Sequence, residues 1–136
     1  MIEVVLMSLL AAANSDAIAE WISLGNDADV ALYVEPTTVR HSGDTVKIWS
    51  LLDYKKLTTD KDTNKTYLSR KDYFEFNCGE AEYRSAASYG FYGNMGRGDV
   101  VYSFLFKSPK WLPVVPDSKL AAVAQFACGR MQAQQF

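Results

Sequence analysis

The residues with the most specific chemistry in this 136-residue chain are its only two cysteines, Cys78 and Cys128. Paired thiols form disulfides, bind soft metal ions or act as redox couples. The chain has no C-x-x-C motif, and its single histidine, His41, leaves no cluster of His and Cys that suits zinc. A disulfide between Cys78 and Cys128 is the favoured interpretation. Two buried free thiols are the alternative, because free cysteine is also commonly buried.

The sequence around each cysteine predicts the element that carries it. Residues 73–78 alternate, so that Phe74, Phe76 and Cys78 share one side, which is the period of a half-buried strand. Near the C-terminus, one apolar stripe at helical spacing contains Leu120, Val123, Ala124, Ala127 and Cys128. If that helix packs on that strand, the two sulfur atoms face each other.

Side chains for catalysis or metal binding are sparse. His41 falls in a predicted turn, residues 41–44, where a nucleophile would have to be brought to it. Asp60 and Asp62 lack the spacing and the glycine of a calcium loop. Residues 93–98 are glycine-rich but lack the Lys-Ser or Lys-Thr pair of a phosphate-binding loop. We therefore expect a protein without enzymatic activity, cofactor or metal ion.

Arg97-Gly98-Asp99 spells the tripeptide that integrins recognise in extracellular matrix proteins. Its chemistry is a cation and a carboxylate displayed at the tip of a flexible loop, with the carboxylate as a ligand for the receptor's metal ion. This motif is one candidate binding site. The alternative is a plain turn before the next strand.

Lysines provide a second candidate binding site, in the most polar stretch of the chain. Lys55, Lys56, Lys61 and Lys65 could meet a polyanion such as a heparin-like glycan. Aspartates are interspersed among these lysines, so a merely solvated loop is the alternative.

Elsewhere the pattern predicts strands joined by short turns. The strand candidates are residues 20–24, 30–34, 45–54, 73–78, 82–92 and 100–106. We expect Pro36 to end the second strand and Gly129 to end the closing helix, whose N-cap is Ser118 or Asp117. Successive strands joined by tight turns pair antiparallel. The fold class is then α+β: an antiparallel sheet of about six strands with a C-terminal helix tethered to one face by the disulfide.

Two strand faces are unusual. In residues 45–54 one face is mixed, and we expect it to be partly exposed or to meet a partner; it carries Lys47, Trp49, Leu51 and Asp53. In the last strand one face is strongly aromatic, with Val100, Tyr102, Phe104 and Phe106. We expect this second face in the core, whereas an exposed part of it would favour self-association.

Composition and the start of the chain bear on location. The net charge of −2 gives no field that would attract nucleic acid. Residues 4–13 are apolar but too short to cross a bilayer, and Ala17-Ile18-Ala19 has the A-x-A form of a cleavage site. We interpret residues 1–19 as a secretory signal peptide and residues 20–136 as one domain. A cut after Ala13, or an ordinary N-terminal helix or strand, is the alternative.

Export would favour the disulfide, because disulfides persist in oxidising compartments. No cysteine lies near the cleavage region, so we expect no lipid anchor there, and no second apolar run is long enough for a membrane anchor. The predicted location is the periplasm, the cell surface or the medium.

Several short motifs lie along nearly the whole chain after residue 19. They are Trp21, Tyr33-Val34-Glu35, Gly43-Asp44-Thr45-Val46-Lys47-Ile48-Trp49, Leu52-Asp53-Tyr54, Cys78, Trp111, Val115-Pro116-Asp117-Ser118 and Cys128. This pattern resembles the bacterial surface-adhesin E family. The resemblance implies an antiparallel sheet with its C-terminal helix tethered by a disulfide. It also implies a surface-exposed protein that can dimerise and bind host proteins such as vitronectin, laminin and plasminogen.

Together these features favour an exported, non-catalytic binding module. Its partner would be a protein of the extracellular-matrix or envelope type, and a homodimer is compatible with the resemblance. The alternative is a periplasmic accessory protein of envelope assembly or stress that has no host ligand.

Overall fold

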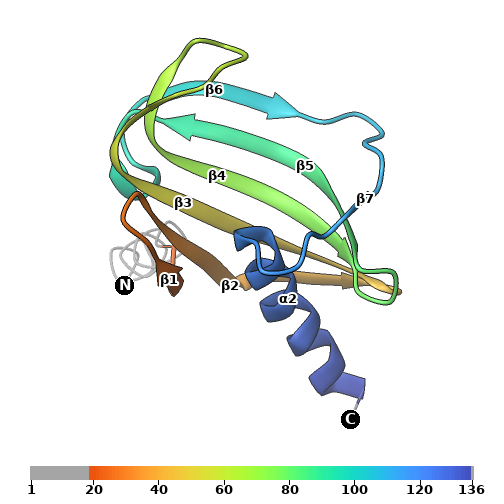
Figure 1. Ribbon diagram of the computed structural model, residues 1–136. Helices are drawn as coiled ribbons and strands as arrows, with labels where there is room; N and C mark the ends of the chain where they lie inside the picture. Colours follow the sequence, from red (N-terminus) through yellow and green to blue (C-terminus); the bar gives the residue numbers. More distant parts are fainter. Residues whose placement is uncertain (1–18, 136) are drawn as a thin grey trace, which may run out of the picture.

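The computed structural model describes residues 19–135, with side chains through residue 129. Apart from Ala19, the proposed signal peptide lies outside the described residues. The described chain forms one antiparallel sheet, a short 3-10 helix and a long α-helix (Figure 1). In chain order the elements are β1 (Ile22–Asn26), β2 (Val30–Ser42), β3 (Thr45–Thr59), β4 (Thr66–Asn77), β5 (Glu82–Phe91), η1 (Asn94–Gly96), β6 (Val100–Leu105), β7 (Leu112–Pro113) and α2 (Lys119–Gln135).

The sheet is a meander in which strands β1 to β6 are neighbours in chain order. The short strand β7 pairs with the beginning of β5, where Leu112 lies opposite Tyr83. Figure 1 shows that the sheet is strongly curved and that α2 lies against one face of it. The predicted fold class, an antiparallel sheet of about six strands with a C-terminal helix, is therefore confirmed.

The hairpin between β2 and β3 follows the sequence prediction. Ser42 pairs with Thr45, so that only Gly43 and Asp44 form the turn. Gly43 has φ of +62°, in the left-handed region that glycine adopts without steric cost.

The predicted end of the second strand was wrong, because Pro36 does not end β2. The strand continues to Ser42, and the pairing register with β3 shifts between Glu35 and Arg40. Proline has no N–H to donate to the ladder, and it is tolerated at such irregular positions. The strand is thus interrupted locally and then resumes its pairing with β3.

The core lies between α2 and the half of the sheet formed by β2, β3 and β4. Its buried members are Leu32, Val34, Val46, Ile48, Phe76, Val123 and Ala127. The predicted alternation in β4 is confirmed, since Phe76 and Cys78 pack toward this core. The predicted helical stripe is confirmed too, since Leu120, Ala124 and Cys128 pack beside the buried Val123 and Ala127.

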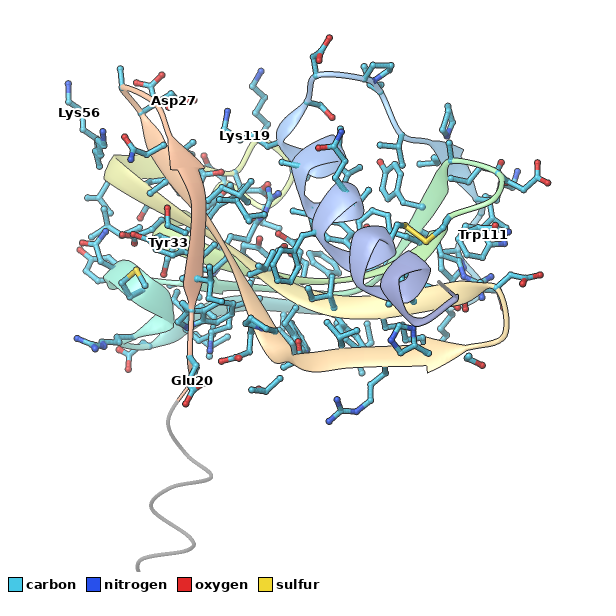
Figure 2. All side chains as sticks on the ribbon, turned by 90° about the horizontal axis from the view of Figure 1, so that it is seen from below. Glu20, Asp27, Tyr33, Lys56, Trp111 and Lys119 are labelled. Atoms are coloured by element: carbon cyan, nitrogen blue, oxygen red, sulfur yellow. A yellow bond between two sulfur atoms is a disulfide. The ribbon has the colours of Figure 1, made fainter. Side chains whose placement is uncertain are left out.

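A disulfide joins Cys78, just after β4, to Cys128 in α2 (Figure 2). The two Cα atoms are 5.7 Å apart, and 50 positions separate the residues in the chain. The alternative of two free thiols is therefore excluded. The bond ties the helix to the sheet at the end of the core.

At its N-terminus, far from the disulfide, α2 is held by a cap and an ion pair. Ser118 is the N-cap, because its Oγ accepts a hydrogen bond from the Ala121 N–H at 3.1 Å. Lys119 Nζ lies 2.9 Å from Asp27 Oδ2 in the turn between β1 and β2. The hydrogen bond from Lys119, with those from the amides of Asp29 and Val30, holds the pKa of Asp27 well below its usual range.

Two other expectations were wrong. Gly129 does not end the closing helix, which runs to Gln135; one glycine costs only about 1 kcal/mol, and good helix formers follow it. The aromatic face of the last strand is not core, since Phe104 and Phe106 are about half exposed, and Val100 lies on the opposite face of the sheet. The helix covers β2 to β4 and leaves β6 at the edge of the sheet without a cover.

Replacing both cysteines, as Cys78→Ser/Cys128→Ser, should lower the free energy of unfolding by about 4 kcal/mol. The reason is that a loop of this length would no longer be closed in the unfolded chain. Urea unfolding followed by circular dichroism measures the change. A reductant should bring the wild type to the same midpoint and leave the double variant where it is. A wild type that is insensitive to reductant and to both substitutions would contradict the prediction.

Candidate functional site

Two hollows of the described chain lie on opposite faces of the sheet. Residues of β4 alternate between them: Arg70 and Asp72 face the side that carries α2, and Lys71 faces the opposite side. We call the hollow on the opposite side the aromatic groove and the one beside the helix the polar cavity.

The aromatic groove has a volume of about 430 Å³. It is lined by Ala19, Trp21, Glu35, Thr38, Trp49, Lys71, Tyr89, Phe91 and Val100. These residues come from the start of the chain and from strands β2 to β6. The groove therefore crosses the sheet on the face opposite α2. The short helix η1 also packs on this face, against Asp53 and Lys71.

A row of packed aromatic rings lines the groove and continues beside it. Trp49 on β3 lies directly opposite Tyr73 on β4, and their ring centroids are 4.7 Å apart. Tyr89 on β5 extends the row, 5.8 Å from Trp49. Cross-strand aromatic pairs of this kind stabilise a sheet and hold the rings in place. The predicted partial exposure of the face around Trp49 holds for Lys47, Trp49 and Asp53, whereas Leu51 on the same face is buried.

Lys71 is the cation of the groove. Its Nζ lies 5.6 Å from the ring centroid of Trp21 and 5.0 Å from that of Phe91. Burial lowers the pKa of Lys71. Among residues 19–129 Lys71 forms no ion pair, so its ammonium group is free to meet an acceptor from a ligand.

Glu35 is the carboxylate of the groove and is only 4% exposed. It accepts hydrogen bonds from the Thr37 N–H at 3.2 Å and the Thr37 Oγ1 hydroxyl at 2.9 Å. It also accepts one from the backbone N–H of Glu20. The sequence analysis did not single out Glu35 or Lys71 as binding residues. The two-residue period of their strands was the signal that could have placed them on the same face.

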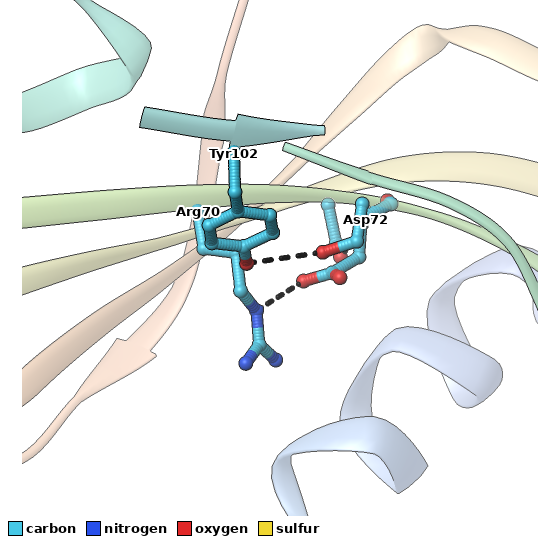
Figure 3. A network of polar contacts seen from close by, with 5 residues as sticks. Arg70, Asp72 and Tyr102 are labelled. Atoms are coloured by element: carbon cyan, nitrogen blue, oxygen red, sulfur yellow. Dashed lines mark hydrogen bonds and ion pairs between the residues drawn. The ribbon is translucent and has the colours of Figure 1, made fainter. Parts of the chain in front are cut away.

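The polar cavity lies beside α2 and has a volume of about 560 Å³. Arg70 Nε donates to Asp72 Oδ2 at 2.8 Å, and the terminal nitrogens of the guanidinium point away from this pair (Figure 3). Ser88 Oγ and Tyr102 Oη are 3.2 Å apart in the same network. Phe104, Phe106, Asp60 and Asp62 also line the cavity.

Burial and charge shift three pKa values in and near this cavity. Burial opposes the charge of Arg70, but the neighbouring Asp72 outweighs it and raises the Arg70 pKa further above its usual value. Burial raises the pKa of Tyr102 and that of Tyr54 to about 12 each. These tyrosines are therefore neutral hydrogen-bonding groups at physiological pH. Arg70 and Asp72 neutralise each other in this cavity, whereas Asp60 and Asp62 line it without an ion pair among residues 19–129.

Arg97, Gly98 and Asp99 are exposed in the turn between β5 and β6. The turn is not the freely flexible loop that we expected. The Gly93 N–H donates to the Arg97 carbonyl at 3.0 Å, and the Tyr92 N–H donates to the Asp99 carbonyl at 2.9 Å. Asn94 Nδ2 also donates to Asp53 Oδ1 at 2.9 Å, which attaches the turn to β3. The tripeptide is displayed outside both hollows, and its role in binding stays a prediction.

The four candidate lysines are exposed but do not form one loop. Lys55 and Lys56 belong to the end of β3, whereas Lys61 and Lys65 lie in the connection to β4. Lys55 Nζ is engaged, donating to the Asp27 carbonyl at 2.6 Å. A polyanion site on these lysines stays a prediction.

Metal-binding and catalytic candidates are not brought together. His41 is exposed near the end of β2, paired with Val46, and not in the turn itself. Asp60 accepts two hydrogen bonds from Thr63, each 2.8 Å long, which close the loop around it. The described residues contain no group of three or more His, Cys, Asp or Glu that could hold a metal ion.

The fold and its two hollows define the class of protein: a curved antiparallel sheet with a disulfide-tethered helix on one face and an open aromatic groove on the other. The family model of surface-adhesin protein E matches residues 21–129, and the chain belongs to this family. No curated protein matches the chain significantly.

Solved structures of Haemophilus influenzae protein E have a similar fold. One has a TM-score of 0.58 at 17% sequence identity and covers 85% of this chain and 88% of that chain. A second crystal form has a TM-score of 0.55 at 15% identity, and the match covers 84% of this chain and 98% of that chain. The protein from a non-typeable strain has a TM-score of 0.58 at 17% identity, covering 85% and 79%. At these identities the likeness concerns the fold alone.

The half-buried tyrosines Tyr54 and Tyr102 should titrate late. We expect the near-ultraviolet absorbance of tyrosinate to show two tyrosines, Tyr54 and Tyr102, with pKa values of about 12. Their folded pKa lies above the unfolded value near 10, so their contribution to stability is complete below pH 10 and is lost as the pH rises toward 12. Tyr102→Phe should remove one late-titrating group. An unchanged titration curve for this variant would contradict the assignment.

Proposed function

We propose that the protein is exported, acts at the cell surface and binds other proteins without catalysing a reaction. Membership of the surface-adhesin protein E family supports this class and fits an exported or surface protein. No helix among the described residues is both long and apolar enough to cross a membrane.

The observation that carries the proposal is the aromatic groove on the face of the sheet opposite α2. Tryptophan and tyrosine dominate the binding energy of many protein interfaces, because they bury large area with few rotamers. The groove offers Trp21, Trp49 and Tyr89 together with the unpaired ammonium of Lys71. A protein segment with an apolar side chain beside a carboxylate or carbonyl group would match this arrangement.

The partner is proposed as a protein of the extracellular-matrix type, such as vitronectin or laminin, as the family resemblance implies. The exposed Arg97-Gly98-Asp99 turn is a second candidate surface for such a partner. The edge strand β6, with Leu105 73% exposed, supports self-association as a further prediction.

Location separates this proposal from that of a periplasmic accessory protein. Intact cells treated with external protease should lose the protein, because a surface adhesin is accessible from outside. A periplasmic marker protein in the same cells should stay intact. Protection of this protein until the outer membrane is permeabilised would instead favour the accessory role in envelope assembly or stress.

Binding to immobilised vitronectin and laminin should depend on the aromatic groove. Trp49→Ala and Tyr89→Ala should each weaken binding by about tenfold or more, because each removes a large aromatic contact. The matched control is Phe104→Ala, an exposed aromatic residue that lines the polar cavity on the other face. Circular dichroism shows whether each variant is folded.

The same assay tests the tripeptide. Asp99→Glu keeps the charge but moves the carboxylate, so weaker binding by this variant would assign the contact to the turn. Equal binding by wild type, Trp49→Ala and Tyr89→Ala would overturn the role of the groove, whatever the result with Asp99→Glu.

A further inference from the structure

Glu35 is a buried carboxylate without a cationic partner in the described part of the chain. The ion pairs among residues 19–129 join Arg70 to Asp72, Arg84 to Glu75 and Lys119 to Asp27. The other two acidic residues that are under 9% exposed, Asp72 and Glu75, thus each hold an arginine. Burial of a carboxylate without a countercharge is costly, so the isolation of Glu35 needs an explanation.

The hydrogen-bond donors to the Glu35 carboxylate are two neutral groups of Thr37 and one backbone amide, while Lys71 lines the same groove without an ion pair to it. That amide is the N–H of Glu20, which donates to Glu35 Oε2. Glu20 lies where the chain enters β1 (Figure 2), and both Glu20 and Ala19 are exposed to solvent. The buried carboxylate is therefore in contact with the nitrogen atom of the peptide bond between Ala19 and Glu20.

The same peptide bond follows Ala17-Ile18-Ala19, the A-x-A sequence of a signal cleavage site. Hydrolysis there adds one water: the bond between the Ala19 carbonyl carbon and the Glu20 nitrogen breaks. The leader leaves with the Ala19 carboxylate, and Glu20 keeps the amine. An α-amino group has a pKa near 8 and takes up a proton at neutral pH. The neutral N–H donor against Glu35 becomes an ammonium group.

We propose that cleavage between Ala19 and Glu20 creates an ion pair between the new α-ammonium group of Glu20 and the buried carboxylate of Glu35. A charge-assisted hydrogen bond is roughly twice as strong as a neutral one, so processing strengthens a contact that the chain already makes. The pair anchors the mature N-terminus to β2. It also fixes the next residue, Trp21, in the wall of the aromatic groove above Lys71.

This proposal is independent of what the groove binds, and thermal stability tests it. Three forms of the chain differ only at the N-terminus: one begins with the free amine of Glu20, one carries an Nα-acetyl group on Glu20, and one has Gly-Ser before Glu20. Acetylation keeps an N–H donor and removes the charge. We expect the free-amine form to melt about 4 °C higher than the other two.

Glu35→Gln is the matched control, since it removes the carboxylate charge and keeps the shape of the side chain. In this background the three forms should melt within about 1 °C of one another. Equal melting temperatures of the three wild-type forms would overturn the proposal, and this comparison does not depend on whether Glu35→Gln folds.

The N-terminus of the exported protein provides the second measurement. Mass spectrometry of protein recovered from the cell envelope should find a chain that begins at Glu20. A chain that begins at Asn14, after the alternative cut at Ala13, or one that keeps the whole leader would overturn the proposal.

Discussion

The disulfide between Cys78 and Cys128 is the constraint on which the arrangement of the molecule depends. It holds α2 against β2, β3 and β4, where Val34, Ile48 and Phe76 form the buried core with the helix. A helix fixed at this place covers only part of one face. The far half of that face is left to the polar cavity, and the opposite face carries only the short helix η1 among the described helices.

The two-residue period of the strands then decides what each face carries. Along β4, Arg70 and Asp72 point to the side of the helix and neutralise each other. Lys71, between them, points to the opposite side, where it lies over the rings of Trp21 and Phe91 and against Gly96 of η1. The same strand thus contributes a paired arginine on one face and an unpaired lysine on the other. This difference is the reason to propose binding in the aromatic groove.

Much of this was predictable from the sequence because the signals were local. Alternation in residues 73–78, the apolar stripe from Leu120 to Cys128 and the Gly43-Asp44 turn each report on their own element. Pro36 did not end its strand, because β2 resumes pairing with β3 after it. Gly129 did not end the helix, because the residues that follow it favour a helix. The aromatic groove was harder to predict from the sequence, since it depends on the pairing register of β2 to β5. That register brings Trp49 opposite Tyr73 and Lys71 opposite Tyr89.

Glu35 shows why register matters for charge as well. Asp72 finds Arg70 two residues away on its own strand, and Glu75 finds Arg84 directly across from it on β5, so both pairs form within the sheet. Glu35 lies opposite Trp49. Lys71 lines the same groove, but no cation of residues 19–129 forms an ion pair with Glu35. The nearest donor that can gain a charge is the nitrogen of Glu20, and it gains that charge only when the chain is cut there. The balance of charges in the aromatic groove would then be set by processing of the chain, and not by its sequence alone.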